Sequence, residues 1–130
     1  FATLDTKISR VYINNKITVG LIDTVGFINN IPTQLIESFK ATFEEIHEAD
    51  YIINVVDIND LNNHIKISNT LAILREIGMN EAKIKNIITV YNKIDLKKRK
   101  PGSINKKNYL SAMNGEGIEL LKTQMEKSLS

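Results

Sequence analysis

The sequence contains no cysteine, so neither disulfide bonds nor thiolate metal sites can form. It also has no apolar run of about 20 residues, the length that spans a bilayer, and no signal-peptide pattern. A cytoplasmic or organellar location without a membrane partner is therefore expected. A strong excess of one charge is absent too, because 17 basic residues face 15 acidic ones. A net charge of +2 does not by itself indicate a nucleic-acid partner, and no DNA partner is expected.

The chain has the size and composition of one globular domain. It has 130 residues, of which 42% are hydrophobic and 25% are charged. We find no internal repeat, low-complexity stretch or linker in it. The first residue is Phe1 and not methionine, so we expect the chain to begin inside a longer protein or to be processed.

The first half of the chain predicts a hairpin and then a helix. Two β-rich runs, residues 10–13 and 17–22, flank the pair Asn14-Asn15, which favours a hairpin turn. Residues 31–49 show apolar side chains at helical spacing. Pro32 suits the first turn of that helix.

Nearly continuous apolar runs predict a parallel sheet. Residues 51–56 and 84–91 are two such runs, typical of strands that are buried on both faces. Residues 104–110 form a weaker, more polar strand. Helices are predicted between and after these strands, the first ended by Gly78 and the last preceded by Gly117. Their apolar faces hold Ile67, Leu71, Leu74 and Ile77, and Ile118, Leu121, Met125 and Leu129. The alternation indicates an α/β fold with right-handed crossovers.

Three polar segments follow strands, where ligands bind in parallel α/β sheets. They are DTVGF (23–27), NKID (92–95) and SAMNGEG (111–117). Each one alone is a weak signal. All three at successive strand ends, in this order, are specific.

The last two segments fit a guanine base. The carboxylate of Asp95 can accept from the N1 and 2-amino hydrogens of guanine, a donor pair that adenine does not offer. The amide of Asn92 can brace the surrounding loops, and the stem of Lys93 can lie over the ring. Backbone N–H groups of the Ser111-Ala112 segment can donate to the guanine carbonyl oxygen.

The first segment fits a metal-bound phosphate. Asp23 can hold the water shell of a Mg²⁺, which prefers oxygen ligands. Gly26 lets a backbone N–H approach a terminal phosphate without a Cβ in the way. These two residues can also be a mere turn, but the segments together favour the phosphate interpretation.

These are the motifs of P-loop GTPases, and the longer pattern resembles the HflX branch of the translation-associated GTPases. The similarity lies in FATLD (1–5), DTVGFINNIPTQLIESFKATFEEIHEAD (23–50), VVD (55–57), YNKIDL (91–96) and SAMNGEG (111–117). The resemblance implies a Ras-like fold, a mostly parallel sheet flanked by helices. It also implies GTP hydrolysis with Mg²⁺, GTP or GDP as ligand, and the large ribosomal subunit, its rRNA and protein, as partner. By the same resemblance Thr3 is the switch threonine, which binds Mg²⁺ and the terminal phosphate.

The chain departs from the family pattern at several positions. Thr6 replaces a proline, Met113-Asn114 replaces a Lys-Thr pair, and Asn54 lies in a buried strand, where its side chain needs a partner. Phe27 stands where Ras-type enzymes have the glutamine that orients the attacking water. No catalytic residue is therefore assigned.

The phosphate-binding motif G-x-x-x-x-G-K-[ST] is absent from the 130 residues. In the family it precedes the FAT segment, so we expect residues 1–130 to be a partial GTPase domain, from switch I to the C-terminal helix. A strand between those ending at Ile22 and Val56 would also be missing. The chain alone is then expected to be inactive.

Other interpretations stay open at this point. One is a degenerate GTPase-like module that binds partners without nucleotide, and another is a GTPase of a related branch. We interpret Asp57 as structural, and His47 and His64 as surface residues. The cations of residues 97–100, with Lys106 and Lys107, either contact RNA phosphates or are merely solvated.

Overall fold

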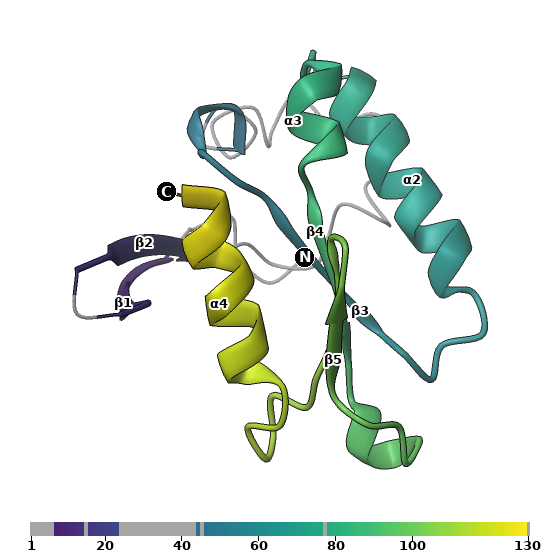
Figure 1. Cartoon of the computed structure of the whole chain (residues 1–130). Coiled ribbons are helices and arrows are strands. Elements are labelled where there is room, and N and C mark those ends of the chain that lie inside the picture. The colour runs from purple at the N-terminus through teal and green to yellow at the C-terminus, as the bar shows by residue number, and fades with distance from the viewer. Residues whose placement is uncertain (1–6, 15, 24–43, 45, 77, 130) are drawn as a thin grey trace.

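A computed structural model describes residues 7–14, 16–23, 44, 46–76 and 78–129 (Figure 1). The strands are β1 (Lys7–Tyr12), β2 (Thr18–Asp23), β3 (Ile53–Asp57), β4 (Ile88–Asn92), β5 (Gly102–Ile104) and β6 (Lys107–Tyr109). The helices are α2 (Asn63–Glu76), α3 (Glu81–Lys85) and α4 (Ile118–Leu129), with a 3₁₀ turn, η4 (Ile94–Leu96). The predicted helix over 31–49 lies outside the described residues except for its end, where residues 46–48 are helical. None of the helices described is both long and apolar enough to cross a membrane.

β1 and β2 form an antiparallel hairpin, in which Lys7 lies opposite Asp23. The side-chain oxygen of Asn14 accepts the N–H groups of Lys16 and Ile17, at 2.7 and 2.8 Å, and so closes the turn. The predicted hairpin is confirmed, although its first strand begins three residues earlier than expected.

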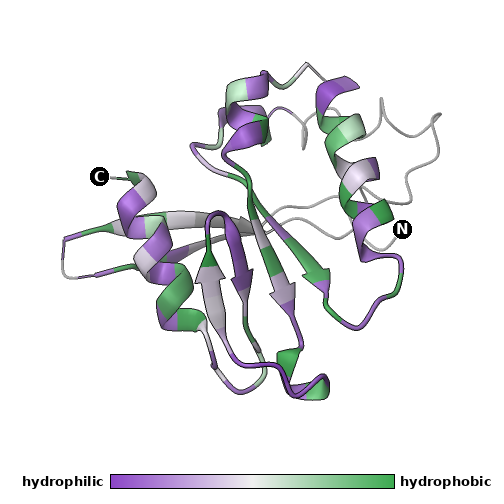
Figure 2. Ribbon diagram, turned by 45° about the vertical axis from the view of Figure 1, so that its right-hand side comes forward, coloured by the Kyte–Doolittle hydropathy of each residue, from purple (hydrophilic) through white to green (hydrophobic). Residues whose placement is uncertain are grey.

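The main sheet has the strand order β3-β4-β6-β5. β3, β4 and β6 are parallel, and β5 is antiparallel to β6, so the mostly parallel sheet is confirmed. α2 and α4 lie on opposite sides of this sheet (Figure 1), and hydrophobic residues concentrate in β3 and β4 between them (Figure 2). Each side of the sheet has its own buried cluster. The cluster on the α2 side consists of Leu74, Met79, Ile84 and Ile87. The cluster on the α4 side consists of Ile88, Val90 and Leu110, which contact Ile118, Leu121 and Met125 of α4.

The predicted strand over 84–91 is wrong at its start. Ile84 belongs to the short helix α3, and the strand begins only at Ile88. Asn80 caps that helix by accepting the N–H of Lys83 at 2.8 Å. The apolar run therefore supplies core residues from two successive elements, because a capping residue outweighs the run's strand pattern.

β3 is not buried on both faces, as its sequence had suggested, since Val55 is 59% exposed. Among the described residues β3 pairs only with β4, and β2 pairs only with β1, so both strands have an open edge. The side-chain nitrogen of Asn54 is buried and has no hydrogen-bond partner in the described part of the chain. The partner that the sequence led us to expect for Asn54 is not found there.

The single strand predicted over 104–110 is instead the hairpin of β5 and β6. Asn105 makes its turn with a left-handed φ of 56°. Gln124 of α4 holds the hairpin: its side-chain oxygen accepts from Asn108, and its nitrogen donates to the carbonyl oxygen of Asn105 at 2.5 Å. The connection from β4 to β6 thus contains η4 and β5, and no α-helix.

Gly117→Ala should lower the free energy of unfolding by about 2–4 kcal/mol. Gly117 has a φ of +85°, and a Cβ there would lie 2.7 Å from the carbonyl oxygen of Tyr109. Gly102→Ala is the matched control, since a Cβ at that position would meet no atom within 4 Å. It should change stability by less than about 1 kcal/mol. Urea unfolding measures both, and equal stabilities of the two variants would contradict the close packing at Gly117.

Candidate guanine-nucleotide site

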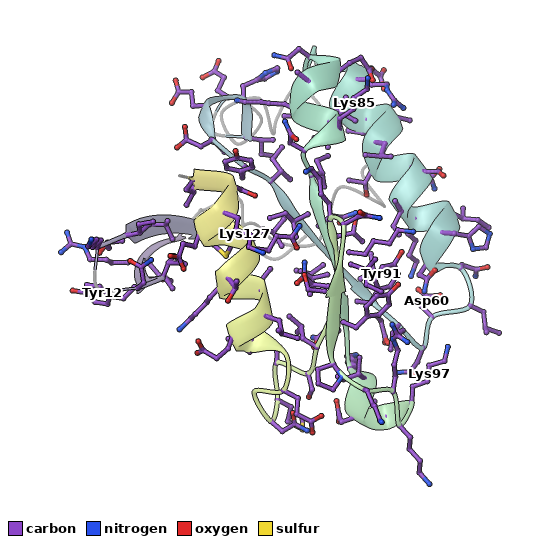
Figure 3. The ribbon with its side chains drawn as sticks, viewed as in Figure 1. Tyr12, Asp60, Lys85, Tyr91, Lys97 and Lys127 are labelled. Atoms are coloured by element: carbon purple, nitrogen blue, oxygen red, sulfur yellow. The ribbon has the colours of Figure 1, made fainter. Side chains whose placement is uncertain are left out.

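Three loops meet at the carboxyl-terminal edge of the main sheet. Asp57 lies beside Asn92 across β3 and β4, and Tyr91 lies beside Tyr109 across β4 and β6. Because these strands are parallel, the segments that follow them leave the sheet at the same edge. Figure 3 shows Asp60, Tyr91 and Lys97 gathered at this end of the molecule.

Asn92, the last residue of β4, joins the loops on either side of it. Its side-chain oxygen accepts the backbone N–H of Ala112 at 2.9 Å. Its main-chain oxygen accepts the N–H of Ile58 at 3.0 Å. This is the bracing geometry that the sequence led us to expect from this amide.

Lys93 is held in a left-handed conformation, with φ 70° and ψ 36°. Its ammonium lies 3.2 Å from a carboxylate oxygen of Asp57, and its main-chain oxygen accepts the side-chain N–H of Asn59 at 3.2 Å. Both side chains of the ion pair are partly exposed, so the pair itself contributes only about 0–1 kcal/mol. Its consequence is positional, because it favours the conformations in which the Lys93 stem extends towards Asp57.

The charge of Asp57 is stabilised by the same cluster. The backbone N–H of Asn59 donates to its carboxylate at 2.8 Å. This bond, and after it the Lys93 ammonium, hold the pKa of Asp57 below its usual value, so Asp57 is ionised at neutral pH. Sequence reasoning gave Asp57 a structural role and missed Asn59. The only signal for Asn59 was its place two residues after a strand-end aspartate.

Asp95 lies in η4 with its side chain exposed. The preceding residue, Ile94, is fully buried and donates its N–H to the carbonyl oxygen of Leu110 at 3.2 Å. No described residue donates a hydrogen bond to the Asp95 carboxylate. An anchored backbone therefore presents a carboxylate whose acceptor positions are open to a ligand.

The loop after β6 is closed upon itself. Ser111 is fully buried, and its N–H donates to the carbonyl oxygen of Glu116 at 2.8 Å. The N–H of Gly115 donates back to the carbonyl oxygen of Ser111 at 2.9 Å. The neighbouring N–H of Ala112 already donates to the side-chain oxygen of Asn92, so a guanine carbonyl oxygen at this place would share or replace that hydrogen bond. Met113, a departure from the family pattern, is 91% exposed and leaves the loop open on that side.

The predicted phosphate and metal residues are described only in part. Asp23 is the last residue of β2, at the strand end where the sequence placed it, and only its backbone position is described. Thr3, Gly26 and Phe27 lie outside the described residues. Within the described ranges no three His, Asp or Glu side chains come together as a metal site.

Fold and site together define a class of protein. The mostly parallel α/β sheet is that of a Ras-like GTPase, and one of its edges carries an exposed carboxylate, a braced amide and a lysine paired with an aspartate. The chain belongs to the family of 50S ribosome-binding GTPases, whose model matches residues 1–93.

Its relatives agree with the resemblance to the HflX branch, which is thereby confirmed. The chain is 37% identical over 129 residues to a GTPase HflX of Caldanaerobacter subterraneus subsp. tengcongensis, covering 99% of this chain and 29% of the relative. It is 47% identical over 97 residues to a GTPase HflX of Flavobacterium psychrophilum, covering 73% of this chain and 22% of that protein. A chloroplastic GTP-binding protein of Arabidopsis thaliana is 39% identical over 118 residues, covering 91% of this chain and 18% of the relative. The chain thus spans less than a third of the length of these proteins.

Proposed function

We propose that this chain is the base-recognition part of a GTPase that binds GTP and hydrolyses it with Mg²⁺. The observation that carries the proposal is the exposed Asp95 carboxylate beside the linked Asn92–Ala112 and Asp57–Lys93 pairs. Guanine offers two adjacent donors to such a carboxylate. The family match and the HflX relatives support GTP as the nucleotide.

The phosphate half of the site is proposed to come from two places. Thr3, Asp23 and Gly26 would supply the switch contacts, since a hydroxyl, a carboxylate and a backbone N–H suit Mg²⁺ and phosphate. The main phosphate loop would lie in chain outside these 130 residues, which do not contain its motif. Bound Mg²⁺ would neutralise charge that develops on the phosphates during transfer.

The partner is proposed to be the large ribosomal subunit, whose state the GTPase would regulate in the cytoplasm or in an organelle. The family description and the chloroplastic relative support this part of the proposal. The alternative, a nucleotide-independent module, is favoured only by the absent phosphate motif.

The 130-residue chain should bind GTP weakly or not at all, whereas the complete GTPase should bind it tightly and reject ATP. Phosphate contacts supply much of the affinity, and their main cradle would be missing from the short chain. Isothermal titration calorimetry with GTP and Mg²⁺ measures both proteins. Sub-micromolar affinity in the 130-residue chain would show that its own segments hold the phosphates. Failure of the complete protein to bind GTP would support the nucleotide-independent module.

A further inference from the structure

Two tyrosines and an arginine form a stack on the sheet face that α4 does not cover. Tyr91 of β4 and Tyr109 of β6 lie side by side, with ring centroids 5.0 Å apart and planes 11° apart. The guanidinium carbon of Arg99 lies 3.7 Å from the centroid of the Tyr109 ring. Ile88 and Val90 pack towards α4, so the alternation of side chains along β4 directs Tyr91 to the other face.

The position of Arg99 is set by its backbone. The N–H groups of Lys97 and Arg99 both donate to the carbonyl oxygen of Ile94, at 3.0 and 3.3 Å. Ile94 itself is fully buried. These bonds anchor the Arg99 backbone, and the cation–π contact places the guanidinium over Tyr109 without any ligand, which lowers the entropic cost of binding to it.

The cations around the stack have no acidic partners in the described part of the chain. The four ion pairs found there engage Lys66, Arg75, Lys93 and Lys122. By contrast, the arginine of the stack belongs to a run of four consecutive cations, all exposed and none in an ion pair with a described acid: Lys97, Lys98, Arg99 and Lys100. Lys107 is also exposed and extends from the same face of β6 as Tyr109. This density of unpaired positive charge is complementary to a polyanion.

Among the described residues, no helix covers this surface. In many α/β folds a helix joins successive parallel strands, but here the link from β4 to β6 holds only η4 and β5. On that side of the sheet α2 packs over β3. Ile104 of β5, which lies opposite Lys107 in the hairpin, is accordingly 64% exposed.

We propose that this region, the Arg99 surface (Tyr91, residues 97–100, Lys107 and Tyr109), binds single-stranded RNA. An unstacked base would lie on the side of the Arg99 guanidinium that is turned away from the Tyr109 ring. The lysines would contact the flanking phosphates. An acidic protein segment would use the charges but would leave that side of the guanidinium without a flat partner. The inference rests on the proposed ribosomal partner for its biological setting, and it adds the surface and the class of ligand.

The test measures fluorescence anisotropy of a labelled 12-nucleotide single-stranded RNA with the complete protein that carries this chain. Arg99→Ala should weaken binding about 5- to 150-fold, the range for losing one stacked base. Arg99→Lys should lose most of the same affinity, because it keeps the charge but not the plane. Replacing Lys97, Lys98 and Lys100 with alanine should reduce the slope of log affinity against log salt by about 2. Lys85→Ala is the control, an exposed lysine of α3 at the opposite end of the molecule (Figure 3), and should bind RNA as wild type does.

The outcomes separate this inference from the proposed function. GTP affinity should be unchanged in all these variants. Wild-type RNA affinity in Arg99→Ala and in the triple lysine variant would overturn the inference, even if large subunits and GTP still bind. If Arg99→Lys binds RNA with wild-type affinity, charge attraction alone explains the binding and the proposed stacking of a base on Arg99 is wrong. If RNA binding depends on Arg99 but purified large subunits do not bind the wild type, the inference holds and the ribosomal part of the proposed function falls.

Discussion

Asp95→Asn should weaken GTP binding by the complete GTPase at least about a hundredfold. The carboxylate of Asp95 is exposed on an anchored turn and accepts no hydrogen bond from a described residue, so both its oxygens are open to the base. Asparagine turns one acceptor into a donor, which then faces a donor of guanine. Xanthine carries oxygen at its 2-position, so the variant should bind xanthosine triphosphate better than wild type does.

Competition between the two nucleotides for wild type and variant measures this effect. Asp50→Asn is the matched control, because Asp50 is an exposed aspartate away from the three loops and should leave both affinities unchanged. Equal GTP affinity in wild type and Asp95→Asn would refute the role of Asp95. A loss of GTP affinity without any gain for xanthosine triphosphate would point to a disturbed loop.

Hydrolysis by the complete GTPase should be slow alone and about 10³–10⁵ times faster on its partner, the range for an arginine supplied in trans. Phe27 occupies the position of the water-orienting glutamine and has no group that can hydrogen-bond to water. The missing group must then come from another switch residue, from the phosphate or from the partner. Phe27→Ala should therefore leave the unstimulated chemical step almost unchanged.

Single-turnover hydrolysis with and without large ribosomal subunits tests this expectation. A fast unstimulated rate that collapses in Phe27→Ala would show that Phe27 positions the water by packing. No acceleration by large subunits, in a protein that binds them, would place the catalytic group within the protein itself.

Sequence patterns predicted the parallel sheet, the two longer helices and the strand-end loops, because each rests on local periodicity or on a motif. The predicted bounds of two strands were wrong because a single capping or turn residue interrupts each strand-like run. Asn80 starts a helix inside what looks like a strand, and Asn105 turns the chain inside what looks like another. Contacts between distant residues were also out of reach, such as the bond from Asn59 to the carbonyl oxygen of Lys93. The motifs predicted that the strand-end loops share one edge of the sheet, but not every pair of atoms that bonds between them.

The direct route from β4 to β6 has a consequence for folding. β4, β5, β6 and α4 occupy one continuous stretch, from Ile88 to Leu129, and the Asn92–Ala112 bond closes a loop of only 20 residues. Contacts between residues near in sequence form early and often define a cooperative unit. Amide hydrogens of this stretch should then exchange as one group. Both loops that would face the base belong to it, whereas Asp23 belongs to the separate β1–β2 hairpin. The loops proposed to face the base can thus be organised first, and the proposed phosphate contacts form later, because they depend on segments that are remote along the chain.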